Sequence, residues 1–421
     1  MQNSSNNIYS RFVSLKKALL SNQNDEKASI FQKFDKCGYV PGINNIKWES
    51  PKRNQEKKEI YPLWIADMDF PVPDFIQKAL ETRVACANYG YTSTSDEYFQ
   101  AIIQWFFKNH SFILKKTDIF RFSAKSLTGL GILIQAFSQP GDGIILATPI
   151  YLAFFHVIDA SGRKIVESPM IYKDRTFFID YDDLEMKILK NRPKMMIFCN
   201  PHNPAGRVWK KNEIERVHEI CLRYEVLLIS DEVFGDLVFE GHQHVVAAYE
   251  PYDQNTILMG SLGKSFNLNG VETGFVVTKN PKLMEKIMKI GEQFALLPDF
   301  GNIFSDVATK AAYSSEGKIW LKYVKEYIYD NYLMMVEYFK ENLKEIVPVV
   351  LEGSYILLCD FEELGISEEE FMKRSEEENI FVNPGSKFHT QRKMFRINIA
   401  CSRQVLRGAL ERWTVIFKKK Y

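Results

Sequence analysis

The chain lacks several features that define large classes of protein. It has no run approaching 18 apolar residues, and its first 27 residues hold no continuous apolar core, so we expect neither a membrane span nor an export signal. It also has no surplus of charge, because 54 Lys and Arg residues stand against 53 Asp and Glu residues and leave a net charge of +1. This balance gives no basic field for nucleic acid or a membrane surface.

Cysteines are few, and repeats and linkers are absent. The six cysteines form no CxxC pair and mostly stand in apolar context, which predicts reduced core residues in a cytoplasmic protein: Cys37, Cys86, Cys199, Cys221, Cys359 and Cys401. The 421 residues are 46% hydrophobic, enough for a large core in two lobes or more. Without a long Pro/Gly linker, a second lobe must be assembled from both ends of the chain. The polar residues 1–32 predict a frayed or loosely docked extension.

The middle of the chain alternates strand-like and helix-like segments. Five apolar, largely branched runs end at turn-forming residues and predict strands buried on both faces: 143–149, 194–200, 226–233, 256–261 and 273–278. Residues 210–224 place an apolar stripe on one helical face, formed by Ile214, Val217, Ile220, Cys221 and Tyr224. The pattern predicts βαβ units and an α/β fold with a mostly parallel sheet.

Three polar residues follow or end successive strands of this sheet. Asn200, Asp231 and Lys264 would converge outside the carboxyl ends of the strands, where parallel sheets bind ligands. Taken alone, each residue has a simpler interpretation. Asn200 could belong to a proline-fixed turn, Asp231 could cap a helix, and Lys264 could be a surface lysine. Together they match what pyridoxal phosphate requires. A carboxylate keeps the pyridine nitrogen protonated, an amide bonds the ring hydroxyl, and a lysine forms the Schiff base.

Several motifs resemble one enzyme family in the same order. The segments CNPHNPAGRVW, ISDEVFGDL, SLGKSFN and FRINIACSR are similar to signatures of class I/II aminotransferases of fold type I. The segments PLWIADMDFPVP, YGYT and TPIYLAFF, with the Asn that follows SLGKSF, resemble the MalY-type branch, the cystathionine β-lyase-like C–S lyases. The likeness runs from about Phe34 to the C-terminus.

The resemblance implies a large cofactor domain over residues 85–315, with a three-layer αβα arrangement around its sheet. Residues 33–84 and 316–421 would combine into a smaller α+β domain, preceded by the extension 1–32. It also implies a homodimer with shared active sites. In that dimer Tyr91 would reach the phosphate of the neighbouring subunit and join Lys264 in catalysis.

The resemblance further implies a role for each residue of the cofactor site. Lys264 would carry the Schiff base, Asp231 would bind the pyridinium nitrogen, and Asn203 would bind the ring hydroxyl. Asn200 would support Asn203 in the same cofactor-binding loop. The others would stack on the ring (Tyr151), cradle the phosphate at a helix start (Lys125, Ser126, Leu127) or add a hydroxyl to that cradle (Ser261). Arg396 would bind the substrate carboxylate with its planar fork.

Two positions depart from the family pattern. Phe234 stands where the family usually has Tyr and this branch has His, which removes one hydrogen bond to the ring oxygen. Glu272 stands where many aminotransferases have a phosphate-binding arginine, and an acid facing a phosphate is repulsive. We therefore expect Glu272 to turn away or a cation to compensate, and Lys125 is the candidate cation, through contact with the phosphate or with Glu272.

The resemblance favours β-elimination, in which an amino acid bearing a β-thiolate gives pyruvate, ammonia and a thiol. Transamination to a keto acid in a biosynthetic pathway is the alternative. A third interpretation is a regulatory or binding protein that keeps the fold without turnover, but the intact Lys, Asp, Asn and Arg set argues against it. No metal site is expected.

Overall fold

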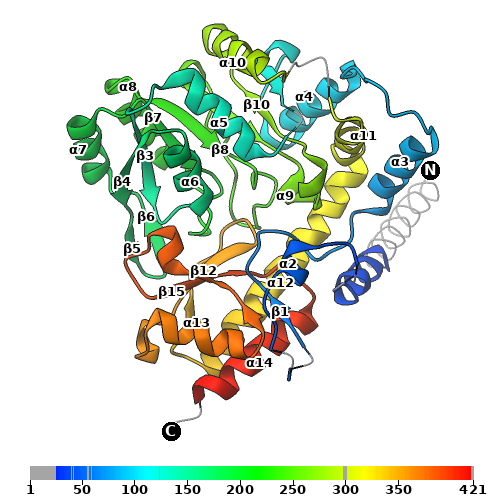
Figure 1. Cartoon of the computed structure of the whole chain (residues 1–421), viewed down its shortest axis with the longest axis vertical. Helices are drawn as coiled ribbons and strands as arrows, with labels where there is room; N and C mark the ends of the chain where they lie inside the picture. The colour runs from blue at the N-terminus through cyan, green and yellow to red at the C-terminus, as the bar shows by residue number, and fades with distance from the viewer. Residues whose placement is uncertain are drawn as a thin grey trace, which may run out of the picture.

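The structure is a computed structural model that describes residues 25–418, apart from 39, 41, 55, 58, 123 and 297–300. It has two lobes, and Figure 1 shows the sheet of the larger lobe above the smaller lobe. The large lobe holds a seven-stranded sheet in the order β2-β10-β9-β8-β7-β3-β4. Its strands are β2 (Ile119–Arg121), β3 (Gly143–Thr148), β4 (Lys164–Pro169), β7 (Met195–Cys199), β8 (Leu227–Asp231), β9 (Thr256–Gly260) and β10 (Phe275–Val277).

The predicted α/β fold is confirmed, and a strand is present in each of the five predicted ranges. Strands β9, β8, β7, β3 and β4 run parallel, whereas β10 pairs antiparallel with both β9 and β2. Neighbouring residues of β3 enter different cores, because Ile144 belongs to one buried cluster and Ile145 to the other. The sheet is therefore covered on both faces, as its continuous apolar strands require.

Helices supply the two covering layers. On one face lie α5 (Ser126–Phe137), α6 (Leu152–Ala160) and α10 (Pro281–Gln293). On the other lie α4 (Asp96–His110), α7 (Tyr181–Asn191) and α8 (Lys211–Arg223). Helix α8 buries Ile214, Val217, Ile220 and Cys221, the stripe predicted from sequence, while Tyr224 is its half-buried C-cap. The short α9 (Gly263–Phe266) follows β9 and carries Lys264.

The small lobe is built from both ends of the chain. Its four-stranded sheet has the order β11-β12-β15-β14, with β11 (Val347–Pro348), β12 (Ile356–Asp360), β14 (Asn383–Pro384) and β15 (Met394–Asn398). A separate pair joins β1 (Tyr61–Pro62) to β13 (Ile380–Phe381) in parallel, which ties the N-terminal segment to the C-terminal one. The remaining helices are α2 (Ile46–Glu49), α3 (Asp74–Ala85), α11 (Ile303–Ala312), α12 (Ser315–Asn342), α13 (Glu368–Glu377) and α14 (Arg403–Lys418), and a short hairpin pairs β5 (Ile171–Lys173) with β6 (Thr176–Phe178).

The predicted N-terminal extension lies partly outside the described residues, which begin at 25. Residues 25–35 are helical and pack against α12. Phe34 is buried, the Phe31 ring lies 5.1 Å from that of Tyr327, and Lys27 pairs with Glu326 at 2.7 Å. Residues 25–32 are thus a docked helix rather than a loose extension. Within the described chain, no helix combines the length and apolarity needed to cross a bilayer.

Candidate active site

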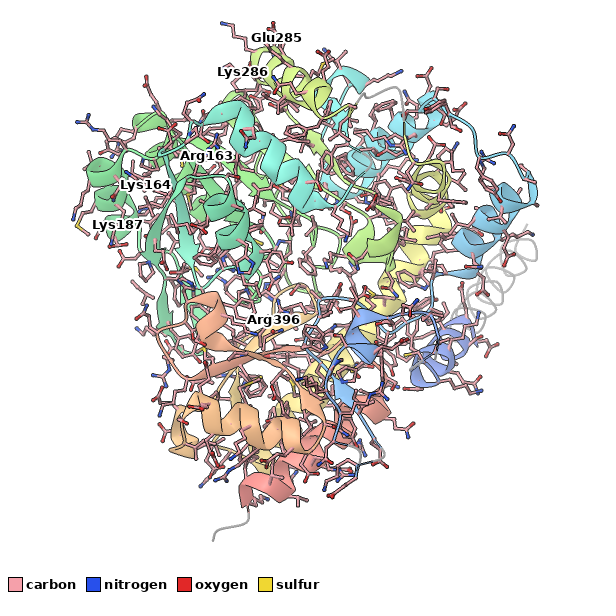
Figure 2. All side chains as sticks on the ribbon, viewed as in Figure 1. Arg163, Lys164, Lys187, Glu285, Lys286 and Arg396 are labelled. Carbon is pink, nitrogen blue, oxygen red and sulfur yellow. The ribbon has the colours of Figure 1, made fainter. Side chains whose placement is uncertain are left out.

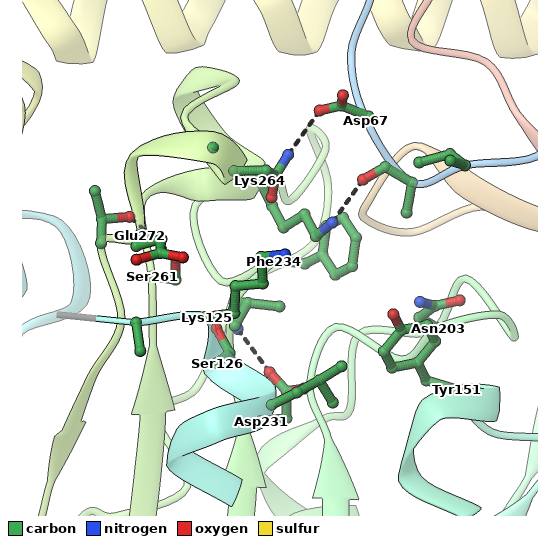
Figure 3. Close-up of a pocket in the computed structure, with 18 of the residues that line it drawn as sticks. Asp67, Lys125, Ser126, Tyr151, Asn203, Asp231, Phe234, Ser261, Lys264 and Glu272 are labelled. Atoms are coloured by element: carbon green, nitrogen blue, oxygen red, sulfur yellow. Dashed lines mark hydrogen bonds between the residues drawn. The ribbon is translucent and has the colours of Figure 1, made fainter. Parts of the chain in front are cut away.

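The carboxyl ends of the central parallel strands open onto a cavity of about 450 Å³ between the lobes. Asp231 is the last residue of β8, Ser261 directly follows β9, and Lys264 lies one turn further on in α9. Figure 3 shows these side chains around the cavity, with Asp67 of the N-terminal segment opposite them. Eight of the predicted site residues line it: Lys125, Ser126, Leu127, Tyr151, Asn203, Asp231, Ser261 and Lys264.

Asp231 is a buried carboxylate at the floor of the cavity, with 6% of its surface exposed. Its Oδ1 accepts a hydrogen bond from the backbone N–H of Val233 at 3.2 Å. Burial raises the pKa of Asp231 to about 6, against the opposing effects of that N–H and of the Lys264 charge. The group is therefore mostly ionised at pH 7 and suited to hold a protonated ring nitrogen.

Lys264 connects the two lobes. Its Nζ donates a hydrogen bond to the backbone oxygen of Ala66 at 2.5 Å, a contact drawn in Figure 3. The pKa of Lys264 is lowered to about 8, mainly by burial. The charges of Asp67 and Asp231 oppose this lowering, and the charge of Arg396 adds to it. At pH 7 roughly a tenth of this amine would be neutral, far more than for an ordinary lysine. A neutral amine is what a nucleophile or general base requires.

The start of α5 presents backbone donors to the cavity, where the phosphate cradle is predicted. Lys125 is the N-cap residue and makes no side-chain cap, so the N–H groups of Ser126 and Leu127 in the first turn are available to an anion. The Ser261 hydroxyl lies 3.1 Å from that of Thr273 and accepts from the N–H of Gly263 at 3.1 Å. These groups form a polar corner suited to a phosphate.

The two asparagines of the loop after β7 have different roles. Asn203 lines the cavity, and its Oδ1 is buried without a hydrogen-bond partner among the described residues. Asn200 is fully buried and does not line the cavity, because its Nδ2 donates to the Val245 oxygen at 3.0 Å and its Oδ1 accepts from the Trp209 N–H at 3.2 Å. The Asn200 amide thus holds the loop that carries Asn203, and a part for Asn200 in cofactor binding stays a prediction.

Arg396 lies in β15 and is not among the residues that line the cavity, but its charge acts on Lys264 and Tyr151, and Figure 2 places it where the two lobes meet. It is 3% exposed, and its Nη2 donates to the Trp64 oxygen at 2.6 Å. Its Nε and Nη1 are buried and have no partner within the described part of the chain. Burial lowers the pKa of Arg396 to about 10, which leaves it charged at pH 7. Two unpaired donors of one guanidinium are suited to a carboxylate.

The remaining predicted residues divide between the cavity wall and the surface. Tyr151 is half-buried at the N-cap of α6, where burial raises its pKa. Tyr91 is fully exposed and does not line the cavity of its own chain, so its part in a neighbouring subunit stays a prediction.

Both departures from the family pattern lie in the cavity wall. Phe234 is buried and meets the Tyr355 ring edge-on at 5.3 Å, so it offers no hydrogen bond to a ligand. Glu272 faces the cavity from a left-handed backbone position, with φ of 60°. Among the described residues no ion pair joins Lys125 to Glu272, so Lys125 does not neutralise it here. Direct contact between Lys125 and a phosphate stays a prediction.

Sequence reasoning missed the contribution of the N-terminal segment. Ala66 and Asp67 line the cavity, and Asp67 Oδ1 accepts from Asn269 Nδ2 at 2.7 Å. Asp69 forms a fully buried ion pair with Lys47 at 2.9 Å, which fixes this segment. The signal was present in PLWIADMDFPVP, where two acids follow an apolar run. Only the tertiary fold brings them to Lys264.

The residues present fit pyridoxal phosphate. The buried Asp231 carboxylate, the unpartnered Asn203 amide oxygen and Lys264 with its lowered pKa all line one cavity, and two guanidinium donors of Arg396 have no hydrogen-bond partner among the described residues. The fold and the site thus define a pyridoxal-phosphate-dependent enzyme of fold type I.

Comparison with known proteins identifies the family. Residues 61–412 match the model of the aminotransferase class I and II family, and the chain belongs to it. It is 30% identical over 387 residues to cystathionine beta-lyase PatB of Bacillus subtilis, covering 90% of this chain and 98% of PatB. Protein MalY of Escherichia coli is 26% identical, over 83% of this chain and 89% of MalY. The crystal structure of cystalysin from Treponema denticola, which contains pyridoxal 5'-phosphate, superposes with a TM-score of 0.86 at 28% identity, covering 91% and 98% of the two chains. The predicted family and cofactor are confirmed.

Proposed function

We propose that this protein is a carbon–sulfur β-lyase that acts on cystathionine or a cysteine conjugate. The reaction consumes the amino acid and water and releases pyruvate, ammonia and a thiol. The observation that carries the choice of reaction is the full-length similarity to cystathionine beta-lyase PatB. The geometry of the cavity supports the roles of the individual residues.

Arg396 and Lys264 divide the work on the substrate. The free Nε and Nη1 of Arg396 bind the α-carboxylate and so fix the amino acid in one orientation. Lys264 Nζ then takes the proton from Cα as its general base, helped by the pKa of about 8. The electron pair left on Cα forms a double bond to Cβ, and the C–S bond breaks to release the thiolate.

The cofactor, when bound, supplies an electron sink that acidifies the Cα proton. Asp231 holds the proton of the ring nitrogen, because its buried carboxylate is ionised and faces the cavity. Asn203 holds the ring oxygen, and the start of α5 with Ser261 holds the phosphate. The apolar wall formed by Phe234 and Val233 excludes water from the ring.

We also propose that the enzyme is a cytoplasmic homodimer in which Tyr91 acts in the partner's site. The full exposure of Tyr91 supports this arrangement, since the side chain does not line the cavity of its own chain. All six cysteines are free thiols, which supports a reducing compartment. Sedimentation of the holoenzyme as a monomer would contradict the shared site.

The proposed reaction is tested by product analysis. The purified holoenzyme is incubated with cystathionine, with cysteine and with several pairs of amino acid and keto acid. We expect pyruvate, ammonia and thiol in equal amounts, with no amino transfer. Amino transfer without pyruvate release would assign the protein to the aminotransferases instead, and the absence of both reactions would leave a binding protein.

A further inference from the structure

A second cavity, of about 610 Å³, lies behind the active site. Its walls come from the end of α4, the loop that follows β8, and the first half of α12. Phe234 lines the active site, whereas the next two residues, Gly235 and Asp236, line this second cavity. The two cavities therefore lie on opposite sides of one short loop.

The charges around this second cavity are unbalanced. Four lysines line it, Lys108, Lys318, Lys322 and Lys325, against a single acid, Asp236. Three of the lysines stand at positions i, i+4 and i+7 of α12, so they share one helical face and repel one another. None of the four forms an ion pair within the described part of the chain. Burial lowers the pKa of Lys325, the charge of Asp236 acts in the opposite direction, and the charge of Lys318 adds a smaller lowering.

Hydrogen bonds within the cavity wall hold both oxygens of Asp236. Its Oδ1 accepts from Trp105 Nε1 at 2.8 Å and lies 3.0 Å from His110 Nε2, and its Oδ2 accepts from the Ser265 hydroxyl at 3.1 Å. His110 in turn lies 3.2 Å from His244. Asp236 keeps its charge, but one carboxylate cannot balance four lysines, so an excess of positive charge remains over the open space.

We propose that this second cavity binds a small multivalent anion of the di- or polyphosphate class. Lysine ammonium groups bind phosphate as point charges, and an anion among them would relieve their mutual repulsion. The volume suits a small molecule rather than a protein segment. The site is separate from the cofactor phosphate cradle, which is built from α5 and Ser261. Its wall is hydrogen-bonded to Ser265, the residue after Lys264, so the anion would lie directly behind the catalytic loop.

Titration calorimetry of the holoenzyme with inorganic pyrophosphate at low salt tests this site. The holoenzyme is used because its cofactor phosphate cradle is filled. We expect saturable binding at one site per chain, weakened about a hundredfold in K318M/K325M, since each lost ammonium contact is worth about tenfold. The charge-preserving K318R/K325R variant should bind within about threefold of the parent protein.

The matched control is K340M, which removes an exposed lysine of the same helix that does not line the cavity. It should leave the affinity unchanged. Retained cofactor absorbance and circular dichroism show that each variant is folded. The proposal is overturned if the parent protein does not bind pyrophosphate, if K318M/K325M binds as tightly as the parent, or if K340M loses as much affinity as the double variant.

Discussion

Replacing Arg396 by methionine should abolish productive binding of the substrate carboxylate while leaving the cofactor in place. The guanidinium has two buried donors without a partner among the described residues, and only Nη2 is used, by the Trp64 oxygen. A hydrogen bond to a charged group contributes about 1.5–3 kcal/mol, so two of them correspond to about 3–6 kcal/mol. We therefore expect kcat/KM to fall by about 10² to 10⁴.

The assay compares an amino acid substrate with its α-methyl ester, which lacks the carboxylate. Arg396→Met should lose activity on the acid and lose little on the ester, because the ester cannot use the fork. Arg396→Lys keeps the positive charge but lacks the paired donors, so its kcat/KM on the acid should lie between those of the parent protein and Arg396→Met. The control is Arg392→Met, which removes a half-exposed arginine paired with Asp360 at 2.6 Å in the same lobe. An equal loss on acid and ester, or a loss on the acid below about threefold, would refute the assigned role.

Three further outcomes follow from the site and its supports. Lys125→Met should raise the dissociation constant of pyridoxal phosphate about ten- to a hundredfold, because one charged contact with the phosphate contributes on the order of 1.5–3 kcal/mol. A dissociation constant that is unchanged at low salt would exclude that contact. When pyridoxal phosphate is added to the apoprotein, the rate at which the yellow absorbance returns should rise about tenfold per pH unit up to pH 8 and then become constant. The reason is that the neutral form of the Lys264 amine attacks the cofactor, and the pKa of this amine is about 8. A rate that still rises toward pH 10 would contradict the lowered pKa. Lys47→Met should lower the free energy of unfolding, measured in urea, by about 3–5 kcal/mol, because it leaves the buried charge of Asp69 unpaired. The control is Lys33→Met, which breaks an exposed ion pair with Asp74 and should lower the free energy of unfolding by less than about 1 kcal/mol. Equal losses in the two variants would contradict this reasoning.

The central sheet was predictable because its parallel strands are buried on both faces. Strands β3, β7, β8 and β9 are buried along their whole length and lie within the predicted ranges. Strand β4 was missed because only two of its six residues are fully buried at this edge, so its sequence KIVESP carries no continuous run. Strand β2 is only three residues long and ends in Arg121, which is buried by stacking on Tyr98 at 4.4 Å.

The site was predictable where chemistry and strand ends coincide. Asp231 and Lys264 follow that rule, and both line the cavity. The strand-end pattern alone indicates Asn200, whereas Asn203 is the amide that lines the cavity, because two amides in one loop differ only in the backbone geometry that directs them. Asp67 was missed for a similar reason: it lies in an irregular segment, and only the docking of the small lobe brings it to Asn269. Tyr91 is fully exposed and lies outside this cavity, so its predicted part in a neighbouring subunit stays a prediction.

The most direct test of the central claim is to locate the cofactor on the chain. The holoenzyme is reduced with borohydride, digested, and mapped by mass spectrometry, with Lys264→Ala treated in parallel. We predict the reduced pyridoxyl group on the peptide that contains Lys264, and a colourless, inactive Lys264→Ala protein that carries no such group. A pyridoxyl group on another lysine, such as Lys125, or activity retained by Lys264→Ala, would contradict the account.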